Sequence, residues 1–363
     1  MKRQTFFYLV LITLFAAITR FWYFWADPLH VDEYWTLEIA RTNVSHIVHF
    51  TMVQDCNPPL FYLADHLSYL AFGYTAFAER LPSVLFGILL IPAVFLLGKQ
   101  IKNDTLGLLA TLGVATLGSM WYYSGFGRSY MLNCLLFTLF TLYFIRICQN
   151  DGRKGENWLV LTAIATLLAY SHLFTLIPMS FLYLYLFFKD WKQTTIWSTI
   201  VSILTAPLGL LFNAILKERA VDRVTAKAVG WNWYGATVPQ LVIFAPLEFF
   251  GYSFVFWIPL IIYSCWKNRE RWELLAVIAS WILSFGTLLA LSDITPVFIR
   301  YTLLCVPAGI TVGLLPVADL IDSKEHTRAQ KAFIIGSFGI IYFAIIMFEF
   351  WSGLYAPKGT ITI

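Results

Sequence analysis

Charged residues are scarce in this sequence, and their scarcity excludes a water-soluble fold. Only 13% of the 363 residues are Asp, Glu, Lys or Arg, whereas a soluble domain carries about 25%. Hydrophobic residues make up 59% of the chain. Lipid must therefore replace water over much of its surface, and the composition predicts an all-α polytopic membrane protein.

The sequence also lacks paired cysteines and a concentrated basic patch. Its five cysteines are scattered and form no CxxC motif, so neither a disulfide framework nor a thiolate metal site is expected. The net charge of +4 is spread along the chain. Because nucleic acids are bound by clustered Lys and Arg, we expect no nucleic-acid partner.

Long apolar runs predict about 11 transmembrane helices in one integral membrane domain covering 1–363. The runs lie near 5–25, 82–98, 105–122, 130–147, 158–172, 173–188, 194–213, 241–265, 272–291, 297–318 and 332–351. The first ends in aromatic residues rather than a small-residue cleavage site, which indicates a retained anchor. Segment 58–73 is shorter and carries Asp65 and His66 at its middle, so we expect an interfacial amphipathic helix there.

The distribution of Lys and Arg tests this assignment. With 26–81 as one large external loop containing interfacial helices, 15 of the 25 Lys and Arg fall on cytoplasmic segments. If 58–73 spans instead, only Lys2 and Arg3 of these 15 stay inside. The positive-inside rule therefore predicts a cytoplasmic N-terminus and, at 214–240, a basic and aromatic loop that is the fourth on the external side.

The remaining polar residues are expected on the external face. Asp32 and Glu33 follow the first span, and Arg128, His172 and Arg300 each lie at the outer end of an apolar run. Cations in such places should face protein or ligand rather than lipid. With Lys217 and Arg219 of the loop 214–240, they would form a cationic pocket suited to a lipid phosphate, opposite carboxylates that could supply a base.

Each of these residues also has a purely structural interpretation. Asp32 and Glu33 would cap the helix that follows them, and Arg128 would anchor the chain at the interface. His172 would be a packed polar residue, and Arg300 would pair with Asp293. Taken singly, these residues leave both interpretations open.

Their order along the chain resembles the GT-C superfamily of membrane glycosyltransferases, most closely its family 39 type, which includes protein O-mannosyltransferases and aminoarabinose transferases. Six motifs of that family have counterparts in order, densely over 1–190 and thinly after it. They are Asp32-Glu33-Tyr34-Trp35-Thr36, Asn57 to Tyr62 (NPPLFY), Arg80 to Ser83 (RLPS), Ser124 to Leu132 around Arg128 and Tyr130, Tyr170 to Phe174, and Arg300 to Leu303.

The resemblance implies a GT-C-like fold and inverting transfer of a sugar from a polyprenyl-phosphate donor to an acceptor hydroxyl on the non-cytoplasmic face. It implies that Asp32 is the general base and that Glu33 supports it. The expected substrate-binding residues are Arg128, Tyr130, His172, Arg300, Asn57, Lys217 and Arg219. The expected partners are the donor, membrane lipid and an acceptor protein, lipid or glycan, in the plasma membrane of a bacterium or archaeon.

No cofactor is expected, because the motif GFGRSY lacks the acidic residue that often precedes the arginine in metal-using relatives. The sequence leaves a divalent metal open. A transporter or flippase of an anionic lipid-linked substrate is the alternative function. It would need ionisable groups or broken helices near the bilayer midplane, usually in repeated halves, and we find no repeat and no carboxylate deep in an expected span before Glu349. A non-catalytic scaffold would leave the external polar residues unexplained.

Overall fold

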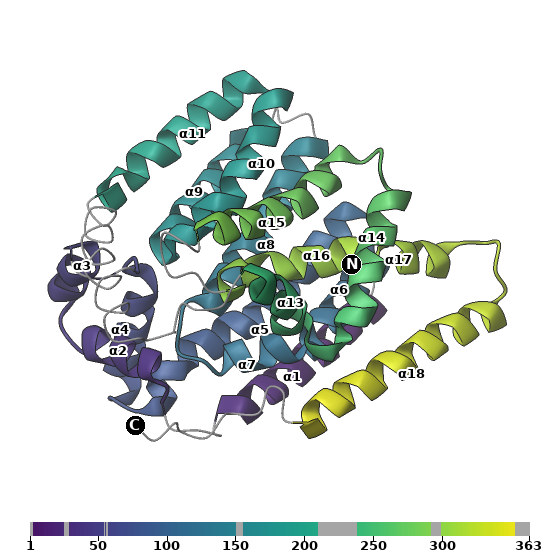
Figure 1. Cartoon of the computed structure of the whole chain (residues 1–363), viewed down its shortest axis with the longest axis horizontal. Helices are drawn as coiled ribbons and strands as arrows, with labels where there is room; N and C mark the ends of the chain where they lie inside the picture. The colour runs from purple at the N-terminus through teal and green to yellow at the C-terminus, as the bar shows by residue number, and fades with distance from the viewer. Residues whose placement is uncertain are drawn as a thin grey trace.

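The computed structural model describes residues 3–24, 29–53, 55, 57–149, 155–209, 238–291 and 299–352, and this part of the chain is helical (Figure 1). The first half contains α1 (Arg3–Phe24), α2 (Val31–Ala40), α3 (Val44–Val53), α4 (Leu60–Phe72), α5 (Ala76–Ile101), α6 (Asp104–Thr116), α7 (Gly118–Ser124), α8 (Tyr130–Gln149) and α9 (Gly155–Ser171). The second half contains η1 (Leu173–Thr175), α10 (Leu176–Lys189), α11 (Trp191–Thr205), η2 (Ala206–Leu208), α13 (Val238–Phe250), η4 (Gly251–Ser253), α14 (Phe254–Lys267), α15 (Trp272–Leu291), η5 (Ile299–Cys305), α16 (Val306–Gly313), α17 (Leu315–Asp322) and α18 (Arg328–Ser352).

Several of these helices are long and apolar enough to cross a membrane. Within the described residues there are seven, or eight if α6 and α7, which meet at an angle of 64°, count as one broken span. The other expected spans, 158–172, 173–188 and 194–213, correspond to shorter helices, and the end of the last lies outside the described residues. The prediction of a polytopic helical membrane protein is confirmed.

The core is formed by α5 and α8, which pack against each other and against α1, α6, α9 and α16 (Figure 1). Close approach of α5 and α6 depends on small residues, because a Cβ atom at Gly98 would lie 2.8 Å from the Cα of Gly107. By contrast, α18 lies at the edge of the molecule and packs against η4, α17 and α7.

The expected span 105–122 is not one straight helix. Leu117 has an extended backbone (φ −74°, ψ 124°) between α6 and α7. The indole nitrogen of Trp121 donates to the carbonyl of Ala115 at 2.6 Å, so a carbonyl beside the break keeps a partner. This agrees with the rule that irregular backbone within a membrane protein occurs where protein groups satisfy it.

Three short helices follow α1 and occupy the predicted first external loop. They have 10, 10 and 13 residues, whereas crossing a bilayer takes about 20. In α4 the exposed residues include Leu67 and Leu70, at 67% and 71%, while Asp65 is fully buried. The helix therefore exposes Leu67 and Leu70 and turns its acid into the protein.

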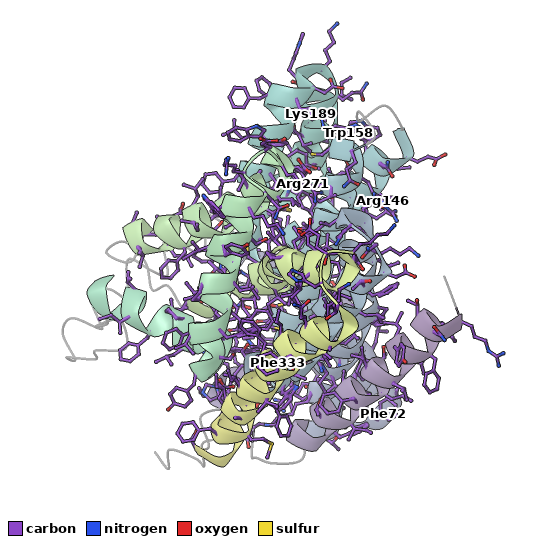
Figure 2. All side chains as sticks on the ribbon, turned by 90° about the vertical axis from the view of Figure 1, so that its right-hand side faces the viewer. Phe72, Arg146, Trp158, Lys189, Arg271 and Phe333 are labelled. Atoms are coloured by element: carbon purple, nitrogen blue, oxygen red, sulfur yellow. The ribbon has the colours of Figure 1, made fainter. Side chains whose placement is uncertain are left out.

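The two ends of the bundle differ in chemistry. Arg80 lies near the start of α5 and Lys99 near its other end, and 26 helical residues extend about 39 Å. At the Lys99 end, Lys102 bonds to Asp319 and Asp322, and Lys267 bonds to Asp319. Figure 2 shows other basic side chains of this end, Arg146, Lys189 and Arg271, in the upper part of the view, away from Phe72 at the end of α4.

Candidate active site

The N-terminus of α2 fixes the geometry of the two adjacent acids. His30 is the N-cap: its Nδ1 accepts a hydrogen bond from the backbone N–H of Asp32 at 3.1 Å, and its own N–H donates to Glu33 Oε2 at 2.8 Å. This reciprocal arrangement is a capping box. Because consecutive residues point in different directions on a helix, Asp32 and Glu33 enter different environments.

Glu33 is a buried structural acid, with 1% exposure. Arg80 donates to both of its oxygens, from Nε at 2.8 Å and from a terminal nitrogen at 2.9 Å. The N–H of Gly127 donates to Oε1 at 2.7 Å. Together with the bond from His30, these contacts satisfy the carboxylate and join α2, α5 and the loop before α8.

Glycine is required at position 127 for this junction. A Cβ atom there would lie 2.7 Å from both Cγ and Oε1 of Glu79, well inside normal contact distance. The loop can therefore approach α5 closely enough for its N–H to reach Glu33.

Asp32 remains accessible, with one third of its side chain exposed. Its Oδ2 lies 3.3 Å from a terminal nitrogen of Arg300, which comes from the other end of the sequence. The guanidinium of Arg300 also lies over the ring of Tyr130, with its centre 5.6 Å from the ring centroid. The structural pairing of Arg300 with Asp293 falls on a residue outside the described part of the chain.

Arg128 approaches Asp32 from the other side. Its NH1 donates to the hydroxyl of Thr36 at 2.9 Å and to the backbone carbonyl of Asp32 at 3.3 Å. Burial by itself would lower the pKa of Arg128, but the neighbouring tyrosine and aspartate side chains outweigh burial and raise the pKa. The guanidinium therefore stays charged and turns toward α2, in contrast to a lipid-facing anchor.

His172 lies near the two arginines but adds no charge. It is 8% exposed, and burial, followed by the charges of Arg128 and Arg300, lowers its pKa to about 3. Its Nδ1 accepts the N–H of Phe174 at 3.2 Å, and its ring lies 4.8 Å from that of Tyr301. The expectation of a third cation is therefore corrected: His172 is neutral near pH 7.

The other expected site residues divide into two groups. Tyr130 contacts Arg300, as described, and Asn57 lines a small pocket together with Thr36, Tyr62 and Arg128. Lys217 and Arg219, with most of the loop 214–240, lie outside the described residues. The structure thus brings Asp32, Arg128, Tyr130 and Arg300 together and places Asn57 beside them.

One carboxylate near this site escaped the sequence analysis. Glu248 lies in α13, inside the expected span 241–265, so the statement that no carboxylate occurs deep in a span before Glu349 is wrong. The hydroxyl of Tyr123 donates to Glu248, and Tyr123 interacts electrostatically with both Glu248 and Arg300. An acid within an apolar run was the available signal.

A groove of about 790 Å³ lies elsewhere in the structure and is bounded by α6, α14, α17 and α18. Lys267 and Asp319 are among its lining residues, which places it toward the basic end of the bundle. The groove is therefore separate from the Asp32 site.

The comparisons with known proteins agree with this architecture. Residues 56–215 match the family described as dolichyl-phosphate-mannose-protein mannosyltransferase. No curated protein sequence matches the chain significantly. Among solved structures, ArnT from Cupriavidus metallidurans bound to undecaprenyl phosphate superposes with a TM-score of 0.62 at 16% identity, over 92% of this chain and 63% of ArnT.

The oligosaccharyltransferase AglB from Archaeoglobus fulgidus, in complex with an inhibitory peptide and a dolichol-phosphate, gives a TM-score of 0.63 at 11% identity, over 98% of this chain and 56% of AglB. The chain shares its fold with these two glycosyltransferases, and its segment 56–215 is similar to the mannosyltransferase family. These likenesses confirm the resemblance expected from the motif order. The chain spans between about half and two thirds of the length of these solved relatives.

Among the described residues, no group of three or more His, Cys, Asp or Glu side chains lies close enough together to hold one metal ion. The positive charge beside Asp32 comes from Arg128 and Arg300.

Proposed function

We propose that this protein is a GT-C glycosyltransferase that transfers a sugar from a polyprenyl-phosphate donor to an acceptor hydroxyl, with inversion, on the non-cytoplasmic side of the membrane. Asp32 is the general base, and Arg128 and Arg300 bind the donor phosphate. Glu33, Arg80 and Gly127 position the helix that carries Asp32.

One observation carries the proposal: an accessible carboxylate and two guanidinium groups meet at the start of α2. Arg300 lies 3.3 Å from the carboxylate of Asp32, and Arg128 lies 3.3 Å from its backbone carbonyl. A base and a phosphate-binding fork are the two parts that this reaction needs side by side.

The reaction can be written from these groups. The acceptor oxygen attacks the anomeric carbon and forms the new glycosidic bond, while the bond from that carbon to the phosphate oxygen breaks and its electron pair leaves with polyprenyl phosphate. Asp32 takes the hydroxyl proton. Arg128 and Arg300 stabilise the charge that grows on the departing phosphate, without help from a cofactor.

The ion pair between Arg300 and Asp32 gives donor binding a second role. A bound phosphate competes with Asp32 for the guanidinium of Arg300. Once Arg300 turns to the phosphate, the carboxylate is free to accept a hydrogen bond from the acceptor hydroxyl. Donor binding would therefore prepare the base before the acceptor reacts.

The proposed membrane side rests on charge. Asp32 and Arg80 lie at one end of the bundle and the Lys102–Asp319–Lys267 network at the other. Because positive residues favour the cytoplasmic side, the Asp32 end would face away from the cytoplasm. The same rule supports an N-terminus on the cytoplasmic side of a bacterial or archaeal plasma membrane.

The test uses the purified protein in lipid nanodiscs with radiolabelled polyprenyl-phosphate sugars, among them polyprenyl-phosphate mannose, and a membrane extract as acceptor source. We expect sugar transfer accompanied by release of polyprenyl phosphate. Asp32→Asn should lower the rate by about 10²–10⁴-fold, the usual contribution of a general base.

Glu38→Gln is the matched control, since Glu38 is an exposed acid of the same helix paired with Arg41. It should keep the wild-type rate. Undiminished transfer by folded Asp32→Asn protein would overturn the assignment of the base. Movement of the intact labelled lipid across the bilayer, without cleavage of the sugar-phosphate bond, would support the flippase alternative instead.

A further inference from the structure

Glu248 is a half-buried carboxylate on a membrane-spanning segment that the proposed transfer step leaves unused. Ionisable groups are costly in such segments and generally have a function or a specific partner. Its partner is the hydroxyl of Tyr123 in α7. Since Tyr123 also interacts with Arg300, Glu248 lies at the same end of the bundle as Asp32.

The carboxylate is not needed to join α13 to α7. The hydroxyl of Ser119 donates to the carbonyl of Phe249 at 2.6 Å and already connects these two helices. Phe249 also packs against Trp281 and Phe285, with ring centroids 5.4 and 6.4 Å away. Neighbouring contacts therefore hold this part of α13 in position and leave Glu248 available for another role.

A cluster of aromatic rings lies between Glu248 and the Asp32 site. Tyr123 contacts Tyr122 and Tyr130 at centroid distances of 5.1 Å each, and Phe126 contacts Tyr130 at 6.1 Å. Tyr123, Phe126 and Tyr130 are buried, whereas Tyr122 is only partly so. We call these four residues the aromatic floor.

Accessible polar groups surround the aromatic floor. Arg300 lies over Tyr130, and the ring of His30 lies 5.3 Å from that of Phe126. Asp32, Arg300 and Glu248 each retain some exposure. This combination suits a sugar: the partly exposed ring of Tyr122, supported by the buried rings, can accept the apolar C–H surface of the sugar, and a carboxylate accepts short hydrogen bonds from its hydroxyls.

We propose that Glu248 and the aromatic floor form the subsite for the sugar of the lipid-phosphate donor. Glu248 accepts hydrogen bonds from sugar hydroxyls, and Tyr123 orients its carboxylate. Arg300 holds the phosphate at the border of the subsite, next to Asp32. The inference rests on the proposed transferase function and adds the residue that distinguishes a sugar-bearing lipid from a bare one.

The test measures binding in nanodiscs for undecaprenyl phosphate and for undecaprenyl-phosphate mannose, glucose and N-acetylglucosamine. The readout is the ratio of the affinity for each sugar-bearing lipid to the affinity for undecaprenyl phosphate. Wild-type protein should prefer at least one sugar-bearing lipid. Glu248→Gln should reduce that ratio by about 10–100-fold, the loss expected for hydrogen bonds to a charged group, while binding of undecaprenyl phosphate stays unchanged.

Two further variants separate recognition from packing. Tyr123→Phe removes the hydroxyl that orients Glu248 and should lower the ratio to a smaller extent. Glu349→Gln changes another acid within a span, whose Oε1 accepts the N–H of Ser253 at 2.7 Å, and should leave the ratio at the wild-type value.

The outcomes distinguish the two proposals. A wild-type ratio near one for every sugar would overturn the proposed function together with the subsite. A wild-type preference that survives Glu248→Gln would overturn the subsite alone. Equal losses for bare and sugar-bearing lipids would also overturn it, because they would indicate a packing role.

Discussion

Asp32 and Glu33 are neighbours in sequence with opposite environments. Glu33 has 1% exposure and bonds to Arg80 and Gly127, whereas Asp32 keeps one third of its side chain accessible. The resemblance assigned the base to Asp32 and a supporting role to Glu33, while the residues alone left helix capping open for both. The division depends on Arg80, 47 residues away, and no local pattern reveals that partner.

The buried ion pair between Glu33 and Arg80 predicts that Glu33 contributes more to stability than Asp32 does. Glu33→Gln removes the negative charge of this pair and should cost about 3–5 kcal/mol of unfolding free energy. Asp32→Asn should change it by less than about 0.5 kcal/mol, as accessible substitutions usually do. Equilibrium unfolding in mixed micelles would measure both.

The double variant Glu33→Gln/Arg80→Gln is the control, because it removes both charges. It should recover part of the stability lost in Glu33→Gln. An unchanged unfolding free energy for Glu33→Gln would contradict the positioning role and return Glu33 to the candidates for chemistry.

His172 makes a prediction about acid stability. Burial lowers its pKa to about 3, while the unfolded chain binds a proton near pH 6.5. The unfolded state therefore holds more protons between these values, and stability is lost as the pH falls through this window. From pH 7 to pH 5, His172 should cost about 2 kcal/mol.

His172→Asn should remove this part of the acid sensitivity, which the same unfolding measurement over pH 5–7 would show. Parallel curves for wild type and variant would mean that His172 is charged in the folded protein.

At the scale of elements, α4 is a helix that the sequence predicted, although the direction in which its acid points was not predictable. Its length and its central acid correctly predicted a short, separate helix. The pattern could not show that Asp65 points inward, because that depends on the packing of α4 against α5 and α2. Neither Asp65 oxygen has a hydrogen-bond partner among the described residues, and burial, followed by the charge of Glu79, raises the pKa of Asp65 well above the usual range.

This acid should make the protein less stable at high pH. The folded state keeps its proton where the unfolded state has lost it, so stability is complete below about pH 3.9 and falls as the pH rises. Asp65→Asn is neutral at every pH. Its melting temperature should therefore rise relative to wild type between pH 4 and pH 8, and a constant difference would contradict the protonated acid.

In α13 the sequence analysis found the helix but missed a polar residue within it. The apolar run 241–265 was correctly predicted to be membrane-spanning, but the carboxylate of Glu248 inside that run was overlooked. Lys217 and Arg219 stay predictions, since they lie outside the described residues. Sequence reasoning was strongest where a motif has a fixed local geometry, as at the start of α2, and weakest for contacts between distant helices.

On the scale of the whole molecule, the helices separate two groups of charged residues at opposite ends of the bundle. Asp32, Arg128 and Arg300 gather at one end, and the Lys102 network occupies the other. The helices long enough to span the membrane were predictable because they are long apolar runs. The bend between α6 and α7 was not, since no proline marks it.

The two ends should face opposite sides of the membrane. In a cysteine-free background, Glu38→Cys should react with a membrane-impermeant maleimide in intact cells. Lys324→Cys, at the basic end, should react only after the cells are opened. Labelling of both positions from the same side would contradict the proposed topology.

The ion pair between Asp32 and Arg300 joins residues 268 positions apart. A ribosome must synthesise most of the chain, and the membrane must receive most of its helices, before these two side chains can meet. Partly made chains would carry the acid without the arginine, and so could neither hold nor cleave an activated lipid-linked sugar. Under the proposed function, the chain would become able to catalyse transfer only late in its synthesis. Unfinished chains would therefore not consume the lipid-linked donor.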